Sequence, residues 1–352
     1  MFEFEEENLF SILTFILGFT YGLLAQRKQF CFSGGIKDII LFDHKKRTIS
    51  LIVAILTAIL STQFLSYTYG IDLTQSRYYL NINYIFIIIG GLMFGYGMMI
   101  SDGCSSRHLI KIAQGEKDSF FILLPLAIFA YITYSLFLHY DTFIYTNSII
   151  SSTTSSDIIK ISLYIPVVIL GYILYKNLKR VKDLLQCWDG LLIGILISFG
   201  WFLTTVVPQE WFVLISPQSF SFVYPLGKII EYISSGFESS YIIFSTIIVF
   251  GVLAGAFISS LFNKKYSKKL MCDNSQQNPP KLWQKMVGGA FMGVGGILAV
   301  GCTVGQGLSG VSTLSIASFI AIISIYISAF VTAKYMKRNN ALVACFIFDF
   351  NE

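Results

Sequence analysis

The chain has 352 residues, of which 55% are hydrophobic and only 13% are charged, and its formal net charge is +5. Its mean hydropathy is +0.68. Because soluble globular domains carry roughly 25% charged residues, this composition excludes a soluble domain and predicts an integral protein of the lipid bilayer. The six cysteines include no C-x-x-C pair, which argues against a zinc site and a dithiol redox motif. We therefore expect no metal, no cofactor and no nucleic-acid partner.

Apolar runs of about 17 to 25 residues, the length that crosses a bilayer, recur along the chain. They fall near residues 9–25, 50–69, 84–101, 118–138, 158–177, 188–206, 240–262, 286–302 and 312–333. Lys and Arg cluster in alternate connections, and the connections between these clusters are poor in both residues. The positive-inside rule then places the N-terminus outside and the C-terminus in the cytoplasm. We predict an all-α polytopic membrane protein with about nine transmembrane helices in a single integral domain, residues 1–352.

Two glycine-rich stretches repeat each other. GGLMFGYGMMISDGCSSRH begins at Gly90, and GGAFMGVGGILAVGCTVGQGLSG begins at Gly288. Five glycines and one cysteine coincide at the offset of 198 residues that separates Cys104 from Cys302. The predicted topology directs the first stretch inward and the second outward, which is the pattern of an inverted repeat. The expected units are repeat 1 at about 9–138, a linking span at about 158–177, repeat 2 at about 188–335 and a cytosolic loop at 263–285.

Each copy is an apolar helix that breaks at a Gly-Cys pair. Glycine-interrupted hydrophobic segments at matching places in two halves are the best sequence indicator of a transporter's substrate site. The segments that follow, 105–114 and 303–309, are too short to span and are predicted to be re-entrant loops or half-helices. Two further short segments, 30–40 and 217–233, resemble them. The four short elements are expected to meet in the middle of the membrane.

Three cysteines, Cys31, Cys104 and Cys302, lie beside glycine at such breaks. A lone cysteine in an apolar helix is usually a small buried hydrophobe, and this interpretation stands for Cys187, Cys272 and Cys345. The shared position of the other three favours a function. The N–H groups and dipole of a short helix attract an anion, and a neutral thiol is a weak donor and acceptor. That combination suits a soft, sulfur-bearing anion.

The candidate substrate-pathway residues are therefore Cys31, Cys104, Cys302, Gly103, Gly301, Thr303, Ser105 and Gln306. None is assigned a catalytic role. Cys104 and His108 are spaced i,i+4 and could share a helical face as nucleophile and base, but no third orienting residue is evident.

Other residues near the breaks have more than one interpretation. Arg107, His108 and Lys111 are functional candidates inside a membrane, or cytosolic charges that only set the topology. Asp102, Lys228 and Glu231 are candidates for internal ion pairs. The small-x-x-x-small motifs at 91–95 and 289–293 favour close helix packing.

The segments QRKQFCFSGGIKD, GCSSRHLIKIAQG, WDGLLIGILISFGW and SFSFVYP, together with the two Gly-Cys repeats, resemble the YeeE/YedE family of bacterial sulfur-compound transporters, which includes TsuA-like thiosulfate importers. The resemblance extends from about residue 10 to 335. It implies a nine-span protein of the bacterial cytoplasmic membrane, with short loops converging from both sides. It also implies that thiosulfate passes along Cys31, Cys104 and Cys302 by hydrogen bonding, and that a small TusA-like sulfur-carrier protein works on the cytosolic side.

Two positions depart from the pattern of the family. Asp102 stands where Gly is expected, and Gln306 stands where His is expected. The predicted function is thiosulfate uptake, with three alternatives. They are import of another sulfur oxyanion or a selenium compound, an intramembrane thiol oxidoreductase, and a membrane anchor for a sulfur carrier without transport of its own.

Overall fold

The computed structural model describes residues 2–79, 83–139, 167–176, 187–210, 216–237, 243–264, 266 and 279–342. Within these residues all regular structure is helical. The long helices are α1 (Phe2–Arg27), α3 (Lys46–Tyr69), α4 (Tyr84–Ile100), α6 (Lys117–His139), α9 (Trp188–Glu210), α11 (Phe244–Phe262), α12 (Leu282–Leu298) and α13 (Ile316–Arg338). The short elements are α2 (Phe32–Phe42), η1 (Leu73–Gln75), α5 (Ser105–Ala113), α10 (Val223–Ser234) and η4 (Gly305–Gly310).

Seven helices in the described part are long and apolar enough to cross a membrane. The all-α polytopic prediction is therefore confirmed, but the count of nine is not. The eighth predicted span corresponds to α12, which has only 17 residues. Of the predicted linking span 158–177, the structure describes a short apolar helix, Val167–Lys176, and the other residues of that span lie outside the described part. The same holds for most of the predicted cytosolic loop 263–285.

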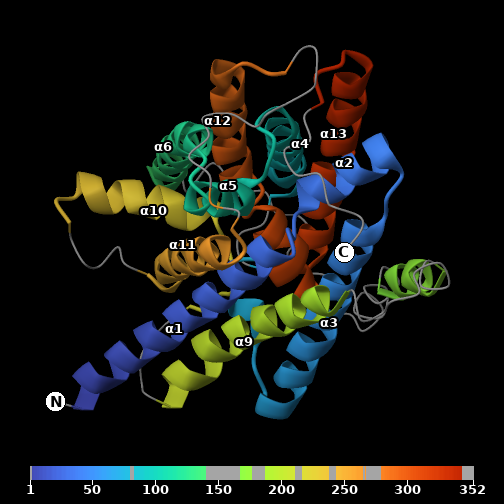
Figure 1. Ribbon diagram of the computed structural model, residues 1–352. Coiled ribbons are helices and arrows are strands. Elements are labelled where there is room, and N and C mark those ends of the chain that lie inside the picture. The colour runs from blue at the N-terminus through green and yellow to red at the C-terminus, as the bar shows by residue number, and fades with distance from the viewer. Residues whose placement is uncertain are drawn as a thin grey trace.

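The long helices form two groups with the short elements between them (Figure 1). In one group α1 packs on α11 and α3 packs on α9, and α1 also contacts α9. In the other, α4 contacts both α12 and α13, and α12 also contacts α6. Suppose that α1, α3, α4 and α6 of the first repeat correspond, in this order, to α9, α11, α12 and α13 of the second. Exchanging each helix for its counterpart then turns the α1–α11 pair into α9–α3 and the α4–α13 pair into α12–α6. The α1–α9 and α4–α12 pairs stay the same. This pairing is the one that two inverted repeats produce.

The contact between α4 and α12 has an antiparallel geometry. Gly90 lies against Gly295, and Gly97 lies against Gly288. The two glycine-rich stretches therefore cross each other in opposite directions, with backbone in direct contact. This close approach requires residues without side chains, as expected for small-residue packing motifs in membranes.

The remaining glycines of the two motifs face other helices. Gly91 and Gly95 lie against α13, whereas Gly289 and Gly293 lie against α6 at Ile122 and Leu126. The predicted packing role of both motifs is confirmed. It also explains how α4 and α12 each contact two neighbours at short range.

The packing of α4 on α12 generates a testable prediction. A methyl group at Gly90 would lie 2.6 Å from the Ala299 nitrogen and 2.6 Å from Leu298 Cβ, whereas one at Gly171 meets nothing within 4 Å. We expect Gly90→Ala to destabilise the protein by about 1–3 kcal/mol through overpacking. Thermal unfolding in detergent, followed by size-exclusion chromatography, measures the difference. Equal melting temperatures for Gly90→Ala and the control Gly171→Ala would contradict the observed crossing.

Candidate substrate pathway

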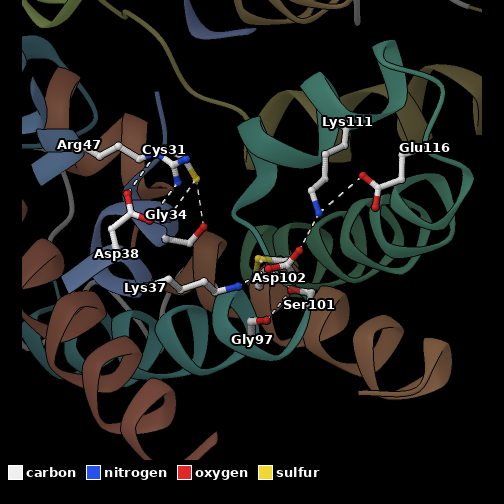
Figure 2. Close-up of polar contacts among 12 residues, drawn as sticks. Cys31, Gly34, Lys37, Asp38, Arg47, Gly97, Ser101, Asp102, Lys111 and Glu116 are labelled. Atoms are coloured by element: carbon white, nitrogen blue, oxygen red, sulfur yellow. Dashed lines mark hydrogen bonds and ion pairs between the residues drawn. The ribbon is translucent and has the colours of Figure 1, made fainter. Parts of the chain in front are cut away.

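Cys31 begins the first short helix. It is the N-cap of α2, and its Sγ accepts a hydrogen bond from the Gly34 N–H at 3.5 Å. The Ser33 hydroxyl lies 3.0 Å from the same sulfur. The thiol thus accepts a hydrogen bond from one of the free N–H groups at the N-terminus of α2, as an N-cap side chain does. Figure 2 shows Cys31 and Gly34 beside the Arg47 and Asp38 side chains.

Cys104 occupies the corresponding place at the break after α4. It is the N-cap of α5, but its side chain makes no capping bond to the helix backbone. Its sulfur instead lies 3.2 Å from the Ser106 hydroxyl. The buried hydroxyl of Ser105 has no hydrogen-bond partner in the structure. The first turn of α5 is therefore an uncapped helix N-terminus inside the protein, where an anion is stabilised by N–H groups and the helix dipole.

Cys302 follows the break after α12. Its sulfur accepts a hydrogen bond from the Gly305 N–H at 3.3 Å. The predicted half-helix continues as a π-helix, Gly305–Gly310, a rare form that often marks functional sites. Gln306 provides a hydrogen-bond partner for the backbone at the break: its Nε2 donates to the Ala299 carbonyl at 2.5 Å.

The two breaks share an unusual backbone conformation. Asp102 and Val300, which correspond at the repeat offset, have φ of 63° and 57°. Side chains rarely adopt this left-handed region, and a β-branched residue is an outlier there. Gly103 and Gly301 follow immediately and lie against the next helical turn, near Arg107 and Gln306 respectively. The predicted role of these two glycines at the break fits this geometry.

The structure brings the predicted cysteines together. Cys31 and Cys104 lie close enough to interact electrostatically, and Thr303, next to Cys302, lies near Cys104. The exposed fractions of Cys31, Cys104 and Cys302 are 5%, 1% and 0%. Thiols from both repeats therefore form one buried centre.

Tyr21 is a member of this centre that the sequence did not indicate. It lies on α1 within electrostatic range of all three thiols and near Ser106. Its ring packs on Phe220 and Phe222, at centroid distances of 5.0 and 5.7 Å. No pattern could have singled it out, because α1 has no break and the residue lies in an uninterrupted apolar run.

The segment before α10 completes the centre from the second repeat. Ser309 of η4 donates to the Phe220 carbonyl at 2.9 Å, and the Ser221 hydroxyl lies beside Gly305. All four short segments predicted from the sequence thus reach the interior. The buried Ser221 hydroxyl has no hydrogen-bond partner in the structure, which adds a polar group to the surroundings of Cys302.

The charged residues near the breaks are mostly paired. Asp102 contacts Lys37 and Lys111, and Lys228 pairs with Glu231 at 2.7 Å. The predicted internal pairing is confirmed for both groups.

The first-repeat cations are not loop charges at the surface. Arg107, His108 and Lys111 are all buried within the protein. His108 Nδ1 lies 3.0 Å from the Ser119 hydroxyl, and the contacts of Cys104 do not include this imidazole. The proposed nucleophile–base pair is therefore not assembled. In the ranges that the structure covers, no group of three or more His, Cys, Asp or Glu residues could hold a metal ion.

Seven span-length helices around a buried centre of thiols, hydroxyls and an uncapped helix N-terminus define a polytopic membrane protein of the transporter class. Residues 27–331 match the family described as "Sulphur transport". The chain belongs to this family.

Two curated relatives align over most of their length. The "Thiosulfate transporter TsuA" of Spirochaeta thermophila is 23% identical over 331 residues, which cover 87% of this chain and 93% of the relative. The protein of the same name from Escherichia coli is 21% identical over 332 residues, covering 83% and 85% of the two chains. The relatives confirm the resemblance that the Gly-Cys repeats indicated.

The proximity of Cys31 and Cys104 can be tested chemically. Phenylarsine oxide bridges two neighbouring thiols, so we expect the detergent-purified protein to take up a single arsenical, visible in the intact mass. Cys31→Ala and Cys104→Ala should each abolish this adduct, whereas Cys187→Ala, which alters a thiol outside the centre, should keep it. An adduct that survives Cys31→Ala would show that these two sulfurs are not the neighbouring pair.

Proposed function

We propose that this protein takes up thiosulfate across the bacterial cytoplasmic membrane, by passage of the anion along cysteine thiols and helix N-termini. The observation that carries the proposal is the meeting of Cys31, Cys104 and Cys302 at three broken helix ends from both repeats. Membership of the sulphur transport family and the names of the two relatives support the choice of substrate.

The thiols supply contacts of moderate strength for a sulfur anion. A neutral S–H is a weak donor, and these sulfurs already interact with Ser33, Ser106 or the Gly305 N–H. Weak contacts at successive positions let an ion both enter and leave, as conduction requires. The open N-terminus of α5 adds a further attraction, because its first N–H groups receive no side-chain cap.

The order of contacts follows from the two repeats. Cys302 belongs to the half of the site that contains η4 and the segment before α10, whereas Cys31 and Cys104 belong to α2 and α5. With the N-terminus outside and the C-terminus in the cytoplasm, the anion meets Cys302 first and leaves beside α2 and α5. A TusA-like carrier on the cytosolic side would then receive the sulfur compound.

One rival function has a specific observation in its favour. The proximity of Cys31 and Cys104 would suit a thiol oxidoreductase, in which the two thiols lose two protons and two electrons to an acceptor and form a disulfide. Peptide mass spectrometry distinguishes the two functions. Transport requires both residues as thiols during turnover, whereas a stable Cys31–Cys104 disulfide that accumulates with an oxidant would favour the redox function.

Uptake measurements test the role of each thiol. In cells that lack other thiosulfate transporters, we expect Cys31→Ala, Cys104→Ala and Cys302→Ala each to lower the initial uptake of labelled thiosulfate by about tenfold or more, since a hydrogen bond to a charged group contributes about 1.5–3 kcal/mol. Cys187→Ala is the matched control, because Cys187 is also a free, buried thiol. Equal uptake by all four variants would remove the cysteines from the mechanism. Parallel uptake of labelled sulfite and selenite tests the alternative substrates.

A further inference from the structure

A buried group of charges lies beside the thiol centre, on the side of α2 and α5. Lys37 of α2 contacts one carboxylate oxygen of Asp102, and Lys111 of α5 lies 2.8 Å from the other. Figure 2 shows the two ammonium groups approaching Asp102 from opposite sides. The exposed fractions of Lys37, Asp102 and Lys111 are 5%, 7% and 2%. One carboxylate thus joins two re-entrant helices to the end of α4.

The group contains two lysines and two carboxylates, of which Asp102 is the more deeply buried. Both ammonium groups contact the Asp102 carboxylate, and Glu116 lies 3.6 Å from Lys111 in a more exposed position. Arg107 is also buried and acts electrostatically on Cys31. Removing charges from water costs several kcal/mol per ion unless partners compensate. A small anion that reaches the two ammonium groups can therefore compensate their charge in place of Asp102.

Asp102 is not required by the turn that it occupies. Its φ of 63° is a conformation that glycine adopts without strain, and the equivalent residue of the second repeat is the uncharged Val300. The position equivalent to Lys111 is Ser309. The charged group therefore belongs to one repeat alone. The contacts with the two lysines therefore account for an aspartate at this position, and the backbone conformation does not.

Unsatisfied polar atoms border the same turn. His108 Nε2 and Ser105 Oγ are buried without a hydrogen-bond partner in the structure. His108 Nε2 would lie 3.3 Å from a Cβ placed on Gly103, which separates Asp102 from Cys104. Buried polar groups are normally paired. Two such atoms beside the turn that holds Asp102 therefore indicate a place for a ligand with several acceptor oxygens.

We propose that Lys37 and Lys111 form a second anion-binding site, selective for a small sulfur oxyanion, which the Asp102 carboxylate occupies when no anion is bound. The inference rests on the proposed function: an anion leaving Cys104 replaces the carboxylate between the two ammonium groups. The carboxylate then returns and displaces the anion. Asp102 is a positioning residue that keeps the affinity of this site low enough for release, as conduction demands.

Two substitutions at Asp102 test this proposal. Asp102→Asn keeps the size of the side chain and removes its charge, and Asp102→Gly removes the side chain at a position whose φ suits glycine. In both, we expect isothermal titration of the purified full-length protein with thiosulfate and with inorganic sulfate to give binding tighter by about tenfold or more, because a competing negative charge is lost. In cells, the KM for thiosulfate should fall together with the maximal rate.

A matched control and a charge-balanced variant accompany them. Asp189 is also a buried carboxylate, but it accepts a hydrogen bond from Ser50 at 2.8 Å, away from the lysines, so Asp189→Asn should leave anion affinity unchanged. Lys111→Gln leaves Lys37 and Asp102 as a neutral pair and should weaken sulfate binding by about tenfold. This variant keeps the proposal testable if the Asp102 variants do not fold.

Several outcomes would overturn the proposal. Unchanged or weaker binding in both Asp102 variants would do so, and so would a change in Asp102→Gly alone, which would trace the effect to the backbone and not to the charge. Unchanged sulfate affinity in Lys111→Gln would overturn it as well. The proposed function is tested separately: if the unmodified protein transports no thiosulfate, that function fails, whereas the sulfate titrations still report on the two lysines.

Discussion

The structure depends on one constraint: inside a bilayer every backbone N–H and C=O must find a partner. A helix that breaks near the middle of a membrane protein exposes such groups, so α4 and α12 can stop at Ile100 and Leu298 only because protein surrounds the breaks. Their antiparallel glycine contacts bring the two broken ends into one interior. The groups that remain available there, above all the first N–H groups of α5, are the ones that can hold an anion.

The two repeats solve the same problem differently. At the break after α4, charge dominates: Asp102 lies between Lys37 and Lys111. At the break after α12, neutral groups dominate: Gln306 bonds the Ala299 carbonyl, and the Cys302 sulfur accepts from the Gly305 N–H. Since the backbone conformation at Asp102 and Val300 is nearly the same, the difference lies in the side chains. The two matching breaks therefore differ in character: one is bordered by charged side chains and the other by neutral ones.

The sequence predicted the parts of this arrangement that rest on local patterns. The Gly-Cys breaks, the short helices after Cys31 and Cys104, and the packing of Gly91 and Gly289 all follow from glycine placement and hydropathy. Hydropathy alone could not fix the count of spans, because α12 has only 17 residues. Nor could it identify Tyr21 or the choice of Asp102 as the partner of Lys37. The position of Tyr21 depends on how α1 is rotated about its axis, and Lys37 and Asp102 are 65 residues apart in the chain. No local sequence pattern encodes either.

The composition of the thiol centre explains why it can be buried at all. An ammonium or carboxylate in place of Cys302 would need a charged partner at zero exposure, whereas a neutral thiol costs little to bury and still offers a weak donor and acceptor. Beside the break after α4, by contrast, the buried charges of Lys37 and Lys111 are compensated by the Asp102 carboxylate that they share. In the proposed pathway, the anion would meet neutral contacts at Cys302 and two ammonium groups at Asp102, where the carboxylate competes with it and so favours its release.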